Sequence, residues 1–208
     1  PADERFEWLE ASAADLSRAM AEGRTTGVAL AQAYLARIAA IDQAGPKLAS
    51  ILELNPDALS LASQLDAERA AGKLRGPLHG IPIVIKDNIA TVDRMQTTAG
   101  SPALLGIAPP RDAALVSRLR AAGALILAKA NLSEWANFRG KNSVSGWSTR
   151  GGQTRNPYAL DRSPSGSSSG SGAAVAANLC AMGVGTETDG SITSPASVSA
   201  LVGMKPTV

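Results

Sequence analysis

Residues 163–208 read SPSGSSSGSGAAVAANLCAMGVGTETDGSITSPASVSALVGMKPTV, and this stretch decides the fold. It holds two loops rich in serine and glycine, 166–172 and 188–191, separated by apolar residues. Tracts of this composition are often flexible linkers. Here, however, Ala173–Cys180 follows without a polar transition and is typical of a buried helix, and Met182–Thr186 is typical of a short buried strand. A loop that opens a buried helix presents backbone N–H groups and hydroxyls at the positive end of that helix, so we interpret it as functional.

The sequence upstream of this stretch alternates apolar strands with amphipathic helices. Strands are expected at 50–54, 81–86 and 124–128, and helices at 12–23, 26–45, 55–71, 112–122 and 131–138. The alternation predicts an α/β fold with a central mixed, largely parallel β-sheet covered by helices. We expect a single domain over 1–208, in which 1–48 is a helical start and 49–208 is the sheet-forming core.

Composition excludes several classes of function. The net charge is +2 without a basic block and aromatic residues make up 3%, so no nucleic-acid partner is expected. Cys180 is the only cysteine, which predicts a buried thiol and leaves no disulfide or metal cluster; we expect no metal and no cofactor. No apolar run approaches the roughly 20 residues of a membrane span. The first residues lack a signal-peptide pattern, so a soluble protein is expected, with the cytoplasm slightly favoured and export after removal of a leader left open.

Serine chemistry requires a base, and the residues offer few candidates. The single histidine, His79, lies in a loop flanked by proline and glycine and is interpreted as a surface or packing residue. Residues 166–170 fit the G-x-S-x-G pattern centred on Ser168, but no buried strand precedes them and no histidine follows, so an α/β-hydrolase remains a minor alternative. Burial can also turn a lysine into a base. Lys86, at the end of an apolar strand, is the best candidate, and Lys205 is expected to be structural.

Three motifs together resemble the signature of the amidase signature family of serine hydrolases. They are G-S-S-S-G-S-G at 166–172, G-T-E-T-D-G-S-I-T-S-P-A at 185–196 and V-G-M-K-P-T at 202–207. The resemblance implies the family's α/β fold and a catalytic triad in which Ser191 is the acylated nucleophile, Ser167 the middle member on a cis peptide, and Lys86 the general base. Ser167 precedes Ser191 by 24 residues, the separation expected in the family. The resemblance also implies an oxyanion hole formed by the backbone N–H groups of Thr188, Asp189, Gly190 and Ser191.

The same resemblance suggests a substrate. The form E-T-D-G-S-I, with N-L-S-E-W-A-N-F-R at 131–139 and G-G-Q-T-R-N-P-Y at 151–158, is similar to the bacterial peptide amidases, which convert the C-terminal amide of a peptide into a free acid and ammonia. The sequence departs from the common family pattern at Asp189, Thr193 and Ser169, where glycine, arginine and glycine are usual. The expected partner is therefore a peptide or small-molecule amide.

Several alternatives remain open from the sequence. Within the family these are a small-molecule or aryl amide amidase and the glutaminase subunit of a tRNA-dependent amidotransferase. Outside it, the chain could be an inactive fragment that serves as a binding or scaffold piece. The resemblance covers only the first part of the family's catalytic domain, so we expect a further C-terminal segment to be needed to complete the fold.

Overall fold

The computed structural model describes residues 6–138 and 140–207, so the remaining residues of the ranges expected above lie outside the described part. The α-helices are α1 (Ala13–Ala21), α2 (Gly27–Arg37), α3 (Ala58–Ala70), α4 (Ala114–Ala121), α5 (Ser169–Ala176) and α6 (Thr193–Val198). The strands are β1 (Ile51–Leu54), β2 (Pro82–Lys86), β3 (Leu125–Ala130), β4 (Trp147–Ser148), β5 (Gly152–Gln153) and β6 (Met182–Val184). A π-helix, η1 (Ile38–Gln43), extends α2, and two short 3₁₀-helices are η2 (Pro102–Leu104) and η3 (Glu134–Asn137).

The central sheet has four strands in the order β1-β3-β2-β6. Strand β2 pairs in parallel with both β3 and β6, and β1 pairs antiparallel with β3. Strands β2 and β3 are buried along their whole length, which explains their continuous apolar sequences. The predicted α/β fold with a mixed, largely parallel sheet is therefore confirmed.

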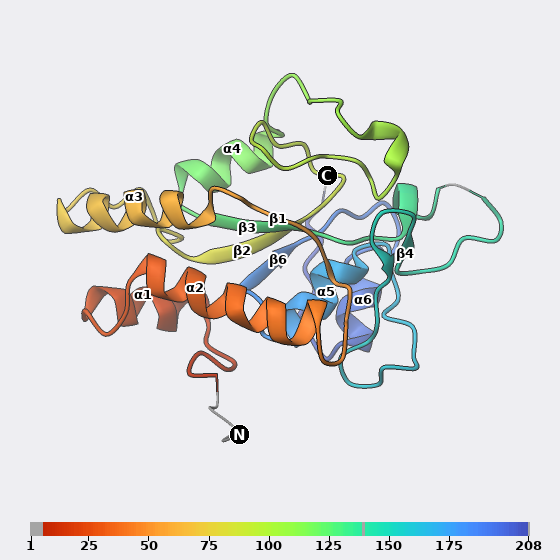
Figure 1. Ribbon diagram of the computed structural model, residues 1–208, viewed down its shortest axis with the longest axis horizontal. Helices are drawn as coiled ribbons and strands as arrows, with labels where there is room; N and C mark the ends of the chain where they lie inside the picture. Colours follow the sequence, from red (N-terminus) through yellow and green to blue (C-terminus); the bar gives the residue numbers. More distant parts are fainter. Residues whose placement is uncertain (1–5, 139, 208) are drawn as a thin grey trace.

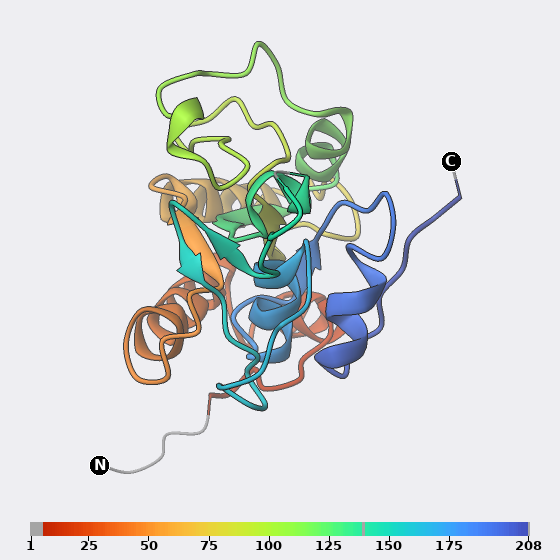
Figure 2. The same cartoon turned by 90° about the vertical axis from the view of Figure 1, so that its right-hand side faces the viewer.

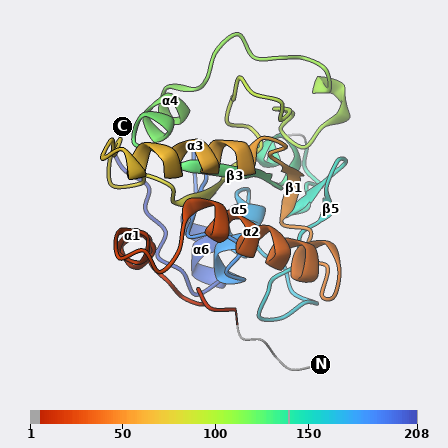
Figure 3. The same ribbon diagram turned by 60° about the vertical axis from the view of Figure 1, so that its left-hand side comes forward.

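Helices cover both faces of this sheet. In Figure 1, α1, α2, α5 and α6 lie below the sheet, and the segment 90–113 with α4 lies above it. Helix α5 packs against β2, β3 and β6, and α2 packs against β2 and α3. Figure 3 shows α2 lying next to α3. The main hydrophobic core lies between these layers and includes Leu30, Tyr34, Ile83, Ile85 and Leu127, all at most 1% exposed.

Local sequence signals explain the starts of the first helices. Ser12 and Asp15 form a capping box at α1, in which the Asp15 N–H donates to Ser12 Oγ over 3.1 Å. Thr26 caps α2, and the Asp66 carboxylate of α3 accepts the N–H groups of Gly27 and Val28 at 2.7 and 2.9 Å. These carboxylate contacts satisfy the unpaired donors of the first turn of α2 and fix α2 on α3.

The structure differs from the sequence-based expectations in three segments. The helix expected over 173–180 begins earlier, at Ser169 inside the serine and glycine tract, and ends at Ala176. The strand expected over 182–186 ends at Val184 and is partly exposed, because β6 lies at the edge of the described sheet. The short helix expected over 131–138 is a 3₁₀ segment with left-handed residues, since Trp135 and Ala136 have φ of 52° and 54°.

The last described residues pass along α6, where Gly203 lies against Ala196, and then run outward (Figure 2). Val202 and Met204 are 97% and 78% exposed. None of the helices among the described residues has the length and apolar character needed to cross a membrane.

Candidate active site

Lys86 is the last residue of the central strand β2, and its side chain reaches the segment that follows β6. The side chain is completely buried. Because water cannot solvate the ammonium there, burial lowers the pKa of Lys86 to about 7, while the Glu187 carboxylate acts in the opposite direction. A substantial fraction of this amine is therefore neutral at neutral pH, which is the state that a general base requires.

Ser167 lies between Lys86 and Ser191. Lys86 Nζ donates to Ser167 Oγ over 2.7 Å, and Ser167 Oγ donates to Ser191 Oγ over 2.9 Å. The Gly166–Ser167 peptide bond is cis, and the Ser167 carbonyl accepts the N–H of Ser133 at 3.0 Å. A side chain at position 166 would collide with Ser133 Oγ, so this close approach of the backbone requires glycine. The structure thus brings the three predicted side chains into one continuous hydrogen-bonded chain.

Ser191 lies in the loop between β6 and α6, and Gly190 before it has a φ of 72°, which favours glycine. The Glu187 carboxylate holds this loop by accepting the N–H groups of Ile192 and Thr193 at 2.6 and 2.8 Å. These contacts lower the pKa of Glu187, so the carboxylate is charged. On the other side, the Ser191 carbonyl accepts the N–H of Ser168 at 3.0 Å. The nucleophile candidate is therefore fixed to the cis-peptide loop through both backbone and side chain.

The four backbone N–H groups expected to form an oxyanion hole differ in their surroundings. Within the described residues, the N–H groups of Thr188, Asp189 and Ser191 have no hydrogen-bond acceptor. The N–H of Gly190 faces the Glu187 carboxylate and contributes to its lowered pKa. Three of the four groups thus have no acceptor among the described residues, and the fourth is directed to Glu187.

Two residues near Lys86 were missed by the sequence analysis. The Lys86 amine also donates to Thr186 Oγ1 over 2.8 Å and to the Thr186 carbonyl over 3.1 Å. Asn88 Nδ2 donates to the same Thr186 hydroxyl over 3.0 Å. Thr186 lies within the G-T-E-T-D-G-S-I motif and Asn88 directly follows Lys86-Asp87, but no sequence pattern places these side chains side by side.

The other residues considered from the sequence lie outside this chain of contacts. Ser168 is buried, and its Oγ donates to the Thr186 carbonyl and accepts the Thr186 N–H, so Ser168 is occupied in holding the backbone. His79 is buried between the Arg75 N–H on Nδ1 and the Leu65 carbonyl on Nε2, which makes it a packing residue. Cys180 is a buried free thiol, as expected, and Lys205 is exposed.

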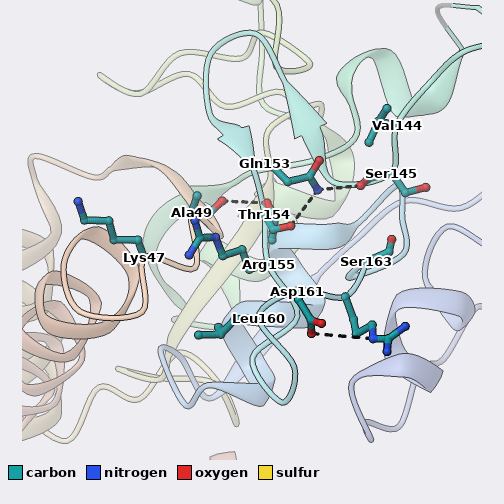
Figure 4. Close-up of a pocket in the computed structure, with 11 residues that line it drawn as sticks. Lys47, Ala49, Val144, Ser145, Gln153, Thr154, Arg155, Leu160, Asp161 and Ser163 are labelled. Carbon is teal, nitrogen blue, oxygen red and sulfur yellow. Dashed lines mark hydrogen bonds and ion pairs between the residues drawn. The ribbon is translucent and has the colours of Figure 1, made fainter.

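A surface cavity of about 560 Å³ is lined by Lys47, Ala49 and residues of the segment 144–163. Figure 4 shows its polar wall, in which Gln153 contacts both Ser145 and Thr154, and Asp161 pairs with Arg162. Lys86, Ser167 and Ser191 do not line this cavity. Among the described residues, no group of three or more His, Cys, Asp or Glu side chains could hold a metal ion.

The chain resembles proteins of known structure over nearly its whole length. A crystal structure of the peptide amidase PAM in complex with the competitive inhibitor chymostatin is 59% identical with a TM-score of 0.94, and the match covers 96% of this chain and 41% of that one. Native peptide amidase from Stenotrophomonas maltophilia is 58% identical with a TM-score of 0.91, covering 94% of this chain and 40% of that one. A glutamyl-tRNA(Gln) amidotransferase subunit of Symbiobacterium thermophilum is 46% identical over 198 residues, which are 94% of this chain and 39% of the relative.

The chain thus spans about two fifths of the length of these relatives. The sequence profile of the Amidase family matches residues 29–208, which include the whole hydrogen-bonded chain from Lys86 to Ser191. On this match, and on the shared fold, the chain belongs to the amidase signature family.

Proposed function

We propose that the protein is a serine amidase that removes the C-terminal amide of peptides, giving a free carboxylate and ammonia. The observation that carries the proposal is the continuous contact from the buried Lys86 amine through Ser167 Oγ to Ser191 Oγ. The similarity to two peptide amidase structures, at 59% and 58% identity, supports the choice of substrate. We further propose that residues 1–208 belong to one catalytic domain, because the described helices pack on one sheet.

The proposed reaction begins with a proton transfer. Neutral Lys86 takes the proton of Ser167 as Ser167 takes that of Ser191, and Ser191 Oγ attacks the amide carbonyl carbon. The C–N bond then breaks as Ser167 delivers a proton to the departing nitrogen, and the Lys86 ammonium returns its proton to Ser167. Ammonia departs, and the acyl group remains on Ser191 as an ester. In the second half, water gives a proton to Ser167, whose own proton moves to Lys86, and the water oxygen attacks the ester carbonyl carbon. The ester C–O bond breaks, and Ser191 Oγ takes back a proton from Ser167 as Lys86 reprotonates Ser167. Protons exchanged among Lys86, Ser167 and Ser191 move along the two contacts of 2.7 and 2.9 Å.

The negative charge that forms on the carbonyl oxygen needs donors. We propose that the N–H groups of Thr188, Asp189 and Ser191 supply them, with the Gly190 N–H contributing when it turns from Glu187. One such donor is typically worth about 3 kcal/mol of transition-state stabilisation. Gly190, directly before Ser191, has a φ of 72°, and glycine permits the tight turn that this conformation makes.

The test is ammonia release from an amidated dipeptide by the purified full-length protein. Lys86→Ala and Ser191→Ala are expected to lower kcat by about 10²-fold or more, since each removes an essential proton acceptor or the nucleophile. Exposed residues of the same types provide matched controls, and Lys205→Ala and Ser197→Ala should keep wild-type rates. Wild-type turnover by Ser191→Ala would exclude Ser191 as the nucleophile.

A serine-reactive phosphonate gives a second readout that is independent of the substrate. Labelling should be confined to Ser191 and should be absent in Ser191→Ala, because only that serine combines partial exposure with the contact to Ser167. A protein that binds amides without turning them over would show neither labelling nor ammonia release, and this result would favour the scaffold alternative.

The glutaminase subunit of an amidotransferase is a second candidate. The 46% identity to a glutamyl-tRNA(Gln) amidotransferase subunit favours it. The two functions are distinguished by the substrate and by the need for partners. Hydrolysis of free glutamine that appears only after partner subunits are added would support the glutaminase, whereas peptide-amide hydrolysis by the protein alone supports the peptide amidase.

A further inference from the structure

Three oxygen atoms contact the Lys86 amine, and a fourth group contacts one of these oxygens. Ser167 Oγ lies at 2.7 Å, Thr186 Oγ1 at 2.8 Å and the Thr186 carbonyl oxygen at 3.1 Å, and Asn88 Nδ2 stands 3.0 Å from that Thr186 hydroxyl. A neutral amine has two hydrogens to donate and one electron pair to accept with. A base that is free to rotate could direct this electron pair to any of its three neighbours, and only one of these, Ser167, leads to the nucleophile.

We propose that Thr186 and Asn88 are positioning residues that orient the neutral Lys86 amine so that its electron pair faces Ser167. The inference rests on the proposed function, in which Lys86 is the general base, and it adds the reason why that base points along the relay. Neither residue contacts Ser167 or Ser191 through its side chain in the described structure, so both act through Lys86.

The carbonyl of Thr186 provides the first constraint. A carbonyl oxygen can only accept, so one hydrogen of the amine is held there in both protonation states of Lys86. The position of this carbonyl is fixed by Ser168, whose hydroxyl contacts the Thr186 oxygen at 3.2 Å and the Thr186 nitrogen at 3.3 Å. The parallel pairing of Ile85 with Val184 brings the ends of β2 and β6 together and so places Thr186 next to Lys86.

The hydroxyl of Thr186 provides the second constraint, and its orientation depends on Asn88. A threonine hydroxyl can also donate, and a hydrogen directed at Lys86 would occupy the electron pair of the base. The Asn88 amide prevents this, because Nδ2 donates to Thr186 Oγ1 over 3.0 Å and Oδ1, at 3.4 Å, is placed to accept its hydrogen. Thr186 Oγ1 is therefore kept as an acceptor toward Lys86, and the electron pair is left for Ser167.

The same set of contacts serves the ammonium. When Lys86 takes the proton of Ser167, its third hydrogen lies on the line to Ser167 Oγ, and the two contacts to Thr186 are unchanged. The proton can thus move back and forth without rearrangement of the amine. Glu187 is the charged group whose field acts on Lys86, and the side chains in direct contact, Ser167 and Thr186, are neutral.

The experiment measures kcat, KM and their pH dependence for ammonia release from an amidated dipeptide. Thr186→Val keeps the shape of the side chain but removes the hydroxyl, and kcat should fall about 10- to 100-fold with KM unchanged. Thr186→Ser restores the hydroxyl and should restore kcat to within about threefold of the wild type. Thr25→Val, a hydroxyl deletion between α1 and α2, is the matched control and should have no effect.

The variant Asn88→Asp provides a second measurement, the pH dependence of kcat, which would not change if Asn88 had a purely structural role. A carboxylate next to Thr186 stabilises the ammonium, so the acid limb of the kcat profile should shift to higher pH. The proposal is overturned if Thr186→Val retains wild-type kcat, or if Asn88→Asp leaves the acid limb in place. Failure of the proposed function itself is recognised separately, because then either the wild-type protein releases no ammonia or Lys86→Ala and Ser191→Ala remain active in the same assay.

Discussion

At the scale of single residues, the protein contains two fully buried lysines that differ in what they contact. Lys86 Nζ reaches two hydroxyls and a carbonyl, and one of the hydroxyls leads to Ser191. Lys129 Nζ donates to the Ile89 carbonyl at 2.6 Å and to Thr97 Oγ1 at 2.8 Å, which ties the segment after β2 to β3. Burial lowers the pKa of Lys129 to about 8, against the fields of nearby carboxylates. The two lysines thus share burial and a lowered pKa, and they differ in that only the hydroxyl beside Lys86 continues to Ser191.

The lowered pKa of Lys86 predicts the pH dependence of the reaction. Only the neutral amine can accept a proton, so kcat should rise as the pH increases through about 7 and reach a plateau above it. The acid limb should therefore lie well below the ordinary lysine value of about 10.4. The measurement is ammonia release from about pH 5 to about pH 9.5, and activity still rising steeply at the upper end would show that Lys86 is protonated at the start of the reaction.

At the scale of elements, the site is formed where three loops meet at the ends of parallel strands. Lys86 ends β2, the loop with Ser191 follows β6, and Ser167 lies just before α5. Carboxyl ends of neighbouring parallel strands lie at the same edge of the sheet, so β2 and β6 bring Lys86 and the loop with Ser191 to one place. Helix α5 then fixes the cis-peptide loop between them by packing on both strands.

The loop that carries Ser191 depends on Glu187. In Glu187→Gln the remaining oxygen can still accept the N–H groups of Ile192 and Thr193, but the charge is lost. Because the charge raises the pKa of Lys86, its removal should move the acid limb of kcat to lower pH. Glu187→Ala also removes the acceptor, and its maximal kcat should fall about tenfold. The pH profiles of kcat for the two variants test these predictions. An acid limb at the wild-type pH in Glu187→Gln would contradict the predicted effect of the Glu187 charge.

The start of α5 predicts a strong effect on stability. An added methyl group at Gly170 would overlap the Ser50 and Asn131 carbonyl oxygens and lie 2.6 Å from the Asn131 nitrogen, so the helix could not stay close to β1 and β3. Gly170→Ala should therefore lower the free energy of unfolding by about 3 kcal/mol or more. Gly140→Ala, where an added methyl group meets nothing within 4 Å, is the control for urea denaturation. Equal midpoints for the two variants would refute this packing argument.

At the scale of the whole molecule, buried polar contacts join the helical start to the sheet. Asp42 in η1 accepts the N–H of Ser50 at 2.7 Å and that of Ile51 at 3.1 Å, where β1 begins. Arg37 of α2 donates to the Ala177 carbonyl at the end of α5 over 2.9 Å. Burial raises the pKa of Asp42, and the hydrogen bonds from Ser50 and Ile51 oppose this shift. Segments far apart in the sequence are thereby held in one body.

Removal of the Asp42 carboxylate should weaken this junction. Asp42→Ala leaves the donors of Ser50 and Ile51 buried without acceptors and should destabilise the protein by about 3 kcal/mol. Asp42→Asn keeps one acceptor and should lose less. Asp161→Ala, which removes an exposed carboxylate, should stay within about 0.5 kcal/mol of the wild type. Thermal unfolding of the full-length protein measures all three, and an Asp42→Ala variant as stable as Asp161→Ala would show that this junction is dispensable.

The sequence by itself determined the elements whose signals are local. The apolar runs of β2 and β3, the capping residues of α1 and α2, and the spacing of Ser167 and Ser191 could all be read along the chain. The motifs also led to the family. Local signals succeed here because a strand buried on both faces needs continuous apolar residues, and a helix start needs a side chain that satisfies its free N–H groups.

Only the tertiary structure decided which groups meet around the base. Thr186 contacts the Lys86 amine, and Asn88 contacts Thr186, because β2 and β6 are aligned in parallel although they lie about one hundred positions apart in sequence. The start of α5 at Ser169 and the partial exposure of β6 likewise depend on what packs beside them. The sequence could place a lysine at the end of an apolar strand, but the lowering of its pKa depends on complete burial, and burial is a property of all the elements that enclose it.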